Sequence, residues 1–435
     1  MSRIIFISLL FIADLIRGPA SVLLIILKNF IPLARKRIDF ERKNLVEEGC
    51  RSFKKDFLIA DYCFEVSSEG ELEQVRPLIE NFLARGLRIE ILFSSPSVES
   101  KCQKLAHDYS DSIRILRLPL ASFAPINFLF FQGLWQWVSA SKIIFCRYDF
   151  FPELLSFKFF GKKLILLSAA DKKHSWFKRE AYSLFDLIVA ANTFEENHFK
   201  KMFPLKRIYS FDFRVPRIFE RVKASGETLN KVGLIKQYLS FLEQRPANSN
   251  IILGSAWVSD LAILKNTELK NDLQSGKVHL TIVPHSLSAP SIQAIKDELK
   301  SSLPEIPVFE LSASSESFGP LGIIILNCSG ILCELYSRFS FSYVGGGYER
   351  SIHSVLEPFL SGSAVSCGPI VHRSTEYDYI KEIAPGEISL LKNPESFYNL
   401  YMDYSKKTPD QTLRSELKNN ASAQMESIIK EIESC

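Results

Sequence analysis

The segment Ser67-Ser-Glu-Gly-Glu-Leu72 places an acidic side chain where a catalytic base could work. Apolar residues at 57–60 and 62–64 predict a buried strand before it, and apolar residues at 72, 75, 78, 79 and 83 recur at helical spacing after it. Ser68 is a favourable N-cap residue, so a strand passes into a helix through a short turn that contains Gly70. In an open α/β sheet such turns lie at the carboxyl ends of the strands, where ligands bind. We therefore expect Glu71 in the first helical turn, where the macrodipole keeps a carboxylate ionised, as a base requires.

The same residues also fit a structural role, the capping box. In that arrangement Ser68 caps the helix, and the Glu71 carboxylate three residues later accepts a hydrogen bond from the Ser68 amide. The segment alone favours the cap over the catalyst, and the choice between them depends on the rest of the chain.

A second segment, Tyr343-Val-Gly-Gly-Gly347 and the residues up to Pro358, predicts a strand, a glycine turn and a helix. Glycines let a backbone approach a ligand closely, and a following helix N-terminus offers free amides to a phosphate or carboxylate. The three glycines, which include Gly346, are consecutive, so this is not the GxGxxG motif of dinucleotide-binding proteins. His353 and Glu357 are four residues apart and are expected on one helix face, where they either contact a nucleotide or pair with each other.

Three further predicted strand ends carry polar side chains. Ser255 and Trp257 follow the apolar run 251–253, and His285 follows the run 279–283. These residues could contact a nucleotide phosphate, although a single histidine at such a position is more often an ordinary loop residue. Arg147 and Asp149 follow the run 142–146 and are expected on the same side of their own sheet.

Short apolar runs alternate with helix-like stretches from about residue 56, which predicts an α/β fold with strands buried on both faces. We expect two Rossmann-like domains that face a cleft, with an acceptor domain at 46–212, a linker at 213–250, a nucleotide domain at 251–405 and a C-terminal helix at 406–435. The predicted strands are 57–62, 89–93, 113–116, 142–146, 164–167, 187–190 and 207–211, then 251–253, 279–283, 308–311, 322–326, 341–344, 364–367 and 388–391.

Composition agrees with a large globular protein. The chain has 435 residues, of which 46% are hydrophobic and 23% charged, and a net charge of +4, which gives no support for nucleic-acid binding. Its eight cysteines form no CxxC pair and mostly lie in or beside apolar runs, as expected of reduced core residues. Its seven histidines show no metal-ligand spacing, so no bound metal is expected.

Residues 1–45 are expected to form a membrane anchor followed by a basic segment. Two apolar runs, 4–13 and 20–27, are interrupted by polar residues and by Pro19, and neither reaches the roughly 18 to 20 residues that a span needs. We predict an interfacial or tilted anchor, with a single distorted span as the alternative. The basic residues that would be attracted to anionic lipid at the cytoplasmic face are Lys28, Arg35, Lys36, Arg37, Arg42 and Lys43.

Several of these motifs occur in one order, and in that order the chain resembles the 3-deoxy-D-manno-octulosonic acid (Kdo) transferases. They are Ser68-Glu-Gly-Glu71 with the helix around Pro77-Leu-Ile79, Gly254-Ser-Ala-Trp257, Pro284-His285, Tyr343-Val-Gly-Gly-Gly347, His353 with Leu356-Glu357, and Gly368-Pro369. The anchor and the basic segment Arg37-Ile-Asp-Phe-Glu-Arg42 add to the likeness, which extends to about residue 380.

The resemblance implies a membrane-associated inverting glycosyltransferase of the GT-B type at the cytoplasmic face of the inner membrane of a Gram-negative-type bacterium. It would move Kdo from CMP-Kdo to a lipid A precursor in lipopolysaccharide biosynthesis, with no cofactor beyond the donor substrate. In that family the glutamate of the first motif is the proposed general base, and here it falls on Glu71. The acceptor side would comprise Ser68, Glu69, Gly70, Arg147 and Asp149, and CMP would contact Ser255, Trp257, His285, Gly346, Gly347, His353 and Glu357.

The chain departs from the family pattern at several of these positions. Glu69 replaces an apolar residue, and a second carboxylate beside Glu71 is expected to raise the pKa of Glu71 if both face the cleft. Arg147 begins a triplet that is usually acidic-Thr-acidic, Ala256 replaces a threonine, and Ser354 replaces an asparagine. Two alternatives therefore stay open: a related membrane-associated transferase with another sugar nucleotide, and a catalytically inactive membrane-tethered binding protein.

Overall fold

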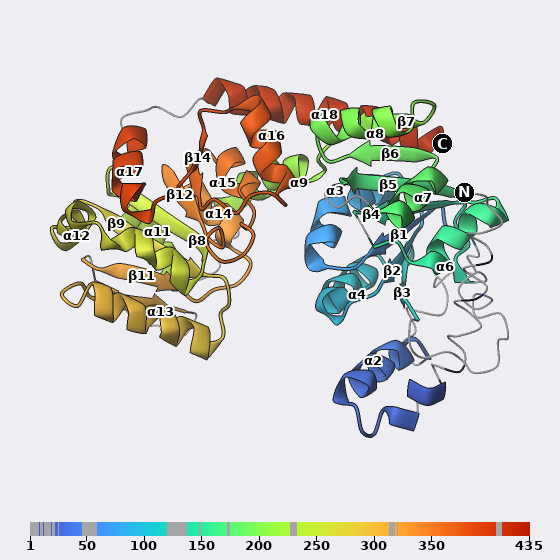
Figure 1. Cartoon of the computed structure of the whole chain (residues 1–435), viewed down its shortest axis with the longest axis horizontal. Coiled ribbons are helices and arrows are strands. Elements are labelled where there is room, and N and C mark those ends of the chain that lie inside the picture. The colour runs from blue at the N-terminus through green and yellow to red at the C-terminus, as the bar shows by residue number, and fades with distance from the viewer. Residues whose placement is uncertain are drawn as a thin grey trace. The chain divides into compact units, whose positions relative to one another are not determined.

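Two parallel β-sheets of seven strands each form the framework of the described part of the chain (Figure 1). The computed structural model describes residues 26–45, 59–119, 137–147, 149–171, 175–226, 233–312, 318–319, 321–405 and 411–435, with isolated positions at 8, 12, 19 and 22–24. The chain divides into unit 1, Met1–Arg214 with Ala423–Cys435, and unit 2, Val215–Ser422.

The sheet of unit 1 has the strand order β3-β2-β1-β4-β5-β6-β7, and all neighbouring strands are parallel. Its strands are β1 Tyr62–Val66, β2 Ile89–Phe93, β3 Ile113–Arg117, β4 Lys142–Cys146, β5 Lys163–Ala169, β6 Leu187–Ala190 and β7 Arg207–Ser210. Its helices are α2 Pro32–Arg42, α3 Glu69–Ala84, α4 Glu99–Asp108, α6 Pro152–Leu155, α7 Trp176–Leu184, α8 Thr193–Met202 and the end of α18 Gln411–Glu433.

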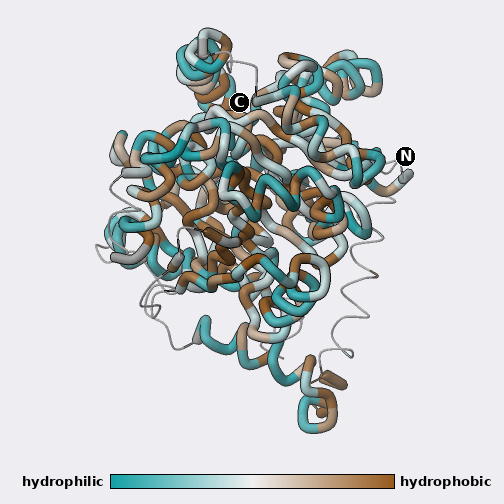
Figure 2. Tube along the Cα trace, turned by 90° about the vertical axis from the view of Figure 1, so that its left-hand side faces the viewer, coloured by the Kyte–Doolittle hydropathy of each residue, from teal (hydrophilic) through white to brown (hydrophobic). Residues whose placement is uncertain are grey.

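Helices cover both faces of this sheet. Successive strand residues point to opposite sides, so neighbouring residues of one strand join different cores. Ile144 of β4 joins a core with α3, α4 and the end of α18, whereas Phe145 joins a core with α6, α7 and α8. Hydrophobic residues lie mostly in the interior of the trace and hydrophilic ones along the outer helices (Figure 2). The predicted continuous apolar runs reflect this burial on two sides.

The sheet of unit 2 is also fully parallel, with the order β10-β11-β9-β8-β12-β13-β14. Its strands are β8 Asn250–Ala256, β9 His279–Pro284, β10 Val308–Leu311, β11 Ile323–Leu326, β12 Phe341–Val344, β13 Ala364–Cys367 and β14 Ile388–Leu390. Its helices are α9 Arg214–Lys223, α11 Gly233–Glu243, α12 Thr267–Gln274, α13 Ala289–Ser302, α14 Leu332–Tyr336, α15 Leu356–Leu360, α16 Thr375–Ile383, α17 Phe397–Ser405 and the beginning of α18.

The segment expected to be a polar, irregular linker holds two helices, α9 and α11, that pack into unit 2. Val215 and Ile218 of α9 are buried in one core, and Tyr238 and Leu242 of α11 are buried in another. Helix α9 buries only one stripe of side chains, so its average composition is polar although it packs as a core helix, whereas α11 is apolar over much of its length.

Near the middle of each sheet lies a position where the order of connection reverses, and such switch points are where open α/β sheets bind ligands. In unit 1 the reversal lies between β1 and β4, which are hydrogen-bonded neighbours. In unit 2 it lies between β8 and β12. Most of the residues that the sequence nominates for chemistry or binding lie in the loops that leave these four strands, in the first turn of α3 or at the end of β8.

The first strand is the one whose predicted position is wrong. We expected it at 57–62, but β1 is Tyr62–Val66, and residues 57 and 58 lie outside the described part of the chain. Residues 63–66 extend β1 beyond the predicted end, and Glu65 among them is fully buried. The other predicted strands coincide with observed ones to within a few residues.

The predicted anchor lies largely outside the described residues, and among those described no helix is long and apolar enough to cross a membrane. Most of the basic segment forms helix α2, and one of its basic residues, Arg37, is bound by the protein itself. The Arg37 guanidinium donates to the Glu41 carboxylate at 2.5 Å and to the carbonyl oxygens of Leu118, at 2.8 Å, and Ser94. Arg37 therefore fixes α2 to the segments that follow β2 and β3 in unit 1.

Candidate functional site

Glu71 occupies the first turn of α3, directly after the turn that leaves β1. The Ser68 hydroxyl accepts from the Glu71 amide at 3.3 Å, and Glu71 Oε2 accepts from the Ser67 amide at 2.6 Å. The predicted reciprocal cap is thus present, but its partner is the amide of Ser67 and not that of Ser68. Capping and catalysis are compatible, because this amide holds one oxygen of a carboxylate that has a second oxygen for other contacts.

The electrostatic setting of Glu71 differs from both of our expectations. Burial raises the pKa of Glu71, the Ser67 amide lowers it, the Asp149 carboxylate raises it and the Arg147 guanidinium lowers it. The net shift is upward, so the helix dipole does not keep the carboxylate as acidic as expected. The neighbouring carboxylate that acts on Glu71 is Asp149, because the side chain of Glu69 is 49% exposed and pairs with Lys101 at 3.0 Å.

A strained backbone positions Arg147 beside α3. Arg147 has a φ of 69°, and Ser168, at the end of the adjacent β5, has a φ of 55°, both in the left-handed region that non-glycine residues seldom adopt. The Arg147 Nε donates to Gln74 Oε1 at 2.9 Å, and Gln74 Nε2 donates to Ser168 Oγ at 2.5 Å. Gln74 and Ser168 were missed in the sequence. Gln74 lies three residues after Glu71, so helical spacing was the signal that could have found it.

Glu65 is the other site residue that the sequence did not reveal. It lies on β1 with 1% of its surface exposed, and its Oε1 accepts from the Ser67 hydroxyl at 2.7 Å. Ser94, directly after β2, donates to the same Ser67 hydroxyl at 2.8 Å. The switch point of unit 1 thus contains three carboxyl groups: Asp149 raises the pKa of Glu71, and Glu71 and Asp149 both raise the pKa of Glu65.

The switch point of unit 2 is aromatic. The rings of Trp257 and His285 stack with centroids 4.4 Å apart, and those of His285 and His353 stack at 4.1 Å. Trp257 Nε1 donates to His353 Nε2 at 3.2 Å, and the Arg350 guanidinium lies 4.3 Å from the Trp257 ring centroid. Burial lowers the pKa of His353 to about 4 and also lowers that of His285, helped by the charge of Arg350. Both imidazoles are therefore neutral at pH 7.

Close backbone packing places the glycine turn against β8. The Asp260 carboxylate accepts from the amides of Trp257 at 2.8 Å and Gly346 at 3.0 Å, and so ties the loop after β8 to the loop after β12. A side chain on Gly347 would come within 2.6 Å of the Gly368 Cα, and Gly346 has a φ of 98°. Ser255, at the end of β8, has a left-handed φ of 52°.

The expected helix face shared by His353 and Glu357 does not exist. The glycine turn continues as irregular chain, and α15 begins only at Leu356, whose amide donates to Glu376 at 3.0 Å. His353 precedes the helix and joins the ring stack, whereas the Glu357 carboxylate accepts from Arg221 of α9 at 3.5 Å. Among the predicted donor contacts, Glu357 is thus the one that lies apart.

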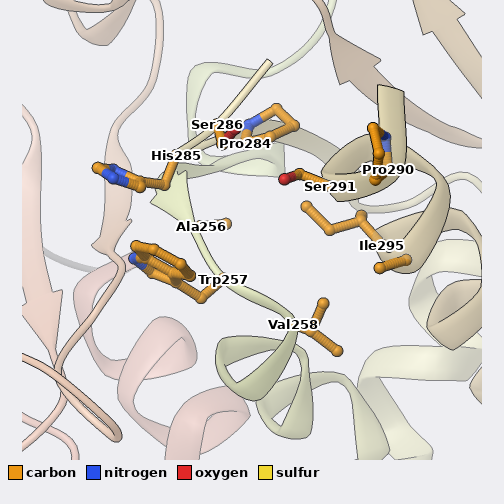
Figure 3. A pocket seen from close by; sticks show the side chains of 10 residues that line it. Ala256, Trp257, Val258, Pro284, His285, Ser286, Pro290, Ser291 and Ile295 are labelled. Carbon is orange, nitrogen blue, oxygen red and sulfur yellow. The ribbon is translucent and has the colours of Figure 1, made fainter. Parts of the chain in front are cut away.

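A cavity of about 260 Å³ lies beside the stack in unit 2 (Figure 3). The Trp257 and His285 rings form one side, and residues of α13, among them Ser291 and Ile295, lie across from them. Apart from the rings and two serines its lining is aliphatic or proline, which suits a planar ligand group with few polar atoms. No cluster of three or more potential metal ligands occurs among the residues that the structure describes.

Neither a protein-family model nor a curated protein sequence matches this chain. Among solved structures, a glycosyltransferase from Rickettsia africae is 13% identical with a TM-score of 0.56, over 86% of this chain and 99% of its own. The UDP-GlcNAc 2-epimerase from Neisseria meningitidis bound to UDP-GlcNAc is 13% identical with a TM-score of 0.55, over 85% and 100%. The chain has the two-domain GT-B fold.

A third GT-B likeness concerns a single domain. The C-terminal CMP-Kdo binding domain of WaaA from Acinetobacter baumannii is 14% identical over 48% of this chain and 98% of its own, but its TM-score of 0.34 is too low to support an argument. At such identities the solved structures establish the fold alone. They include an epimerase as well as a glycosyltransferase, so the GT-B fold does not fix the reaction, which depends on the site residues.

Proposed function

We propose that the protein is an inverting glycosyltransferase that moves Kdo from CMP-Kdo to a lipid A precursor. The GT-B fold supports a sugar-nucleotide enzyme, and the ordered motifs shared with Kdo transferases support this donor and acceptor. The observation on which the proposal mainly rests is the placement of Glu71, a buried carboxylate held by the Ser67 amide at the switch point of unit 1.

Glu71 would act as the general base. Its carboxylate takes the proton of the acceptor hydroxyl while the acceptor oxygen attacks the anomeric carbon of Kdo, and the bond to the phosphate oxygen breaks so that CMP leaves with the electron pair. Attack opposite the leaving group inverts the anomeric configuration. A raised pKa suits this role, because a base is most effective when its pKa approaches the working pH.

The switch point of unit 2 would hold the donor. Trp257, His285 and His353 present neutral ring faces and edges, and Gly346 and Gly347 let the backbone come close to a ligand. Arg350 supplies a positive charge next to the stack, which suits a phosphate. We assign Glu357 no direct contact with the donor, since it pairs with Arg221.

The proposal includes the setting of the reaction. The body of the protein would work at the cytoplasmic face of the inner membrane, held there by the segment before residue 45, and the donor would be bound without a protein-held metal or other cofactor. The lipid acceptor would come from that membrane.

The test is a transfer reaction with purified full-length protein in detergent, CMP-Kdo and a tetra-acylated lipid A precursor. We expect CMP release and a lipid whose mass has grown by one or more Kdo units, detected by mass spectrometry. Parallel reactions with UDP- and GDP-sugars serve as controls. Turnover with one of these instead of CMP-Kdo would favour a related transferase, and tight CMP binding without turnover on any acceptor would favour an inactive binding protein.

A further inference from the structure

Glu65 has its carboxyl group at a buried position where an apolar side chain would carry a smaller desolvation cost. It lies on the central strand β1, fully buried, and its Oε2 has no hydrogen-bond partner. An ionised carboxylate with such poor solvation would be very unfavourable. Burial raises the pKa of Glu65 far above its ordinary value, and the Glu71 and Asp149 carboxylates raise it further. Burial and the unpartnered oxygen therefore both favour the neutral form of Glu65.

Ser67 connects Glu65 to Glu71. The Ser67 hydroxyl donates to Glu65 Oε1 at 2.7 Å and accepts from the Ser94 hydroxyl at 2.8 Å, while the Ser67 amide donates to Glu71 Oε2 at 2.6 Å. The side chain of Ser67 is thus held by Glu65 of β1 and by Ser94 after β2. The backbone amide of Ser67 in turn holds the Glu71 carboxylate. A change in the backbone conformation at Ser67 would misalign the amide that stabilises the charged form of Glu71.

We propose that Glu65 is a positioning residue that acts on Glu71 through Ser67. This inference rests on the proposed function, in which Glu71 is the base. Glu65 holds Ser67 in the orientation that directs its amide at Glu71. In the neutral form that burial favours, Glu65 does so without adding a negative charge behind the base.

Among the residues that the structure describes, few titratable groups lie near Glu65 and Glu71. Glu71 and Asp149 act on Glu65, and Asp149 and Arg147 act on Glu71. The thiols of Cys63 and Cys146 lie close enough to be influenced, but burial raises the pKa of both far above neutrality, so they stay neutral. The variants of Glu65 leave Asp149 and Arg147 in place. A shift of the acid limb of the pH profile after substitution of Glu65 therefore reports on the contact between the Ser67 amide and Glu71, or on a changed influence of Asp149 or Arg147 on Glu71.

The test compares Glu65→Gln with Glu65→Leu in the transfer reaction. Glutamine keeps a neutral oxygen acceptor for Ser67, so we expect kcat within about twofold of wild type and an unchanged acid limb. Leucine removes the acceptor, so kcat should fall about tenfold, with KM for both substrates unchanged and the acid limb moved to higher pH. An unmoved acid limb in the leucine variant, or equal impairment in the glutamine variant, overturns the proposal.

Ser67→Ala provides a second route that does not depend on the folding of the leucine variant. Alanine keeps the amide and removes the hydroxyl, so the acid limb of Ser67→Ala should move to higher pH, as in Glu65→Leu. The double variant that combines Ser67→Ala with Glu65→Leu should show no further shift. Additive shifts in the double variant contradict an action of Glu65 through Ser67.

A substrate-free measurement separates this inference from the proposed function. The pKa of Glu71 can be followed by NMR with glutamate labelled at Cδ, the resonance being assigned by its loss in Glu71→Gln. We expect a higher Glu71 pKa in Glu65→Leu than in wild type or Glu65→Gln. If this holds while no transfer occurs, the function fails and the positioning stands; if transfer occurs and the pKa does not move, the positioning fails.

Discussion

The two switch points are built on the same kind of sheet, yet burial acts on them in opposite directions. At the end of β1 burial raises the pKa of acids, Glu65 and Glu71, and in the ring stack of unit 2 it lowers the pKa of bases, His285 after β9 and His353 after β12. Both effects favour the neutral form. In unit 2 neutral rings can stack, whereas in unit 1 the Ser67 amide and Arg147 have to oppose the effect to keep Glu71 available as a base.

The largest effect should follow from removing the base. Glu71→Gln keeps the acceptor for the Ser67 amide but cannot take a proton, so kcat for CMP release should fall by about 10²- to 10⁴-fold. The matched control is Glu80→Gln on the same helix, which breaks only the pair with Arg76 and should be almost fully active. Wild-type activity in the Glu71 variant would refute the assigned base.

Glycines distinguish the two turns by packing. In unit 2 a methyl group on Gly347 would meet the Gly368 backbone at 2.6 Å, so Gly347→Ala should destabilise the protein by about 1–3 kcal/mol. In unit 1 Gly70 lies within α3 and has open space, so Gly70→Ala should stabilise by about 0.5–1 kcal/mol. Urea unfolding measures both, with Gly386→Ala as the control in open space. Similar effects at positions 347 and 70 would contradict this difference.

Asp149 should shift the pH at which the base works. Its carboxylate raises the pKa of Glu71, so Asp149→Asn should move the acid limb of the kcat profile to lower pH. Arg147→Gln removes the opposing positive charge and should move the limb to higher pH. We expect each shift to be about one pH unit or less, because the groups are partly solvated. Shifts in the same direction for both variants would be inconsistent with this electrostatic account.

The smallest effect concerns the pH dependence of stability, with opposite signs in the two units. The pKa of His353 falls from an unfolded value of 6.5 to about 4, so its contribution is present above pH 6.5 and is lost as the pH falls toward 4. The pKa of Glu71 is raised on folding, so its contribution is present at low pH and is lost as the pH rises through the folded value.

Urea unfolding between pH 5 and 8 tests both signs. His353→Gln should lose less stability than wild type on acidification, and Glu71→Gln should lose less than wild type on alkalinisation. Parallel pH curves for wild type and either variant would show that the group does not titrate as described.

The framework of the fold was predictable because strands buried on two faces are continuous apolar runs, and thirteen of the fourteen strands coincide with such runs. The missed features are those in which a local pattern is overridden by distant contacts. Glu65 is an acidic residue but is buried inside β1, and α9 looks polar but buries Val215 and Ile218.

The positions of several candidate residues in the fold were predictable, but their contacts were not. Glu71 lies in the first helical turn as expected, but the carboxylate that acts on it is Asp149, more than seventy residues away, and not the neighbouring Glu69. His353 was expected to share a helix face with Glu357, yet α15 begins three residues later, where Glu376 binds its first amide. Spacing along the chain cannot reveal such through-space partners.

Helix α18 imposes an order on the synthesis of this protein. Ile428, Ile429 and Ile432 complete the core that α3 and α4 share with β1, so part of that face of the sheet stays uncovered until residues 423–435 are made. Ribosomes add about 5–20 residues per second, so unit 2 separates the two parts of unit 1 by roughly ten to forty seconds. During that time the nascent chain presents an uncovered apolar surface on which a chaperone could act.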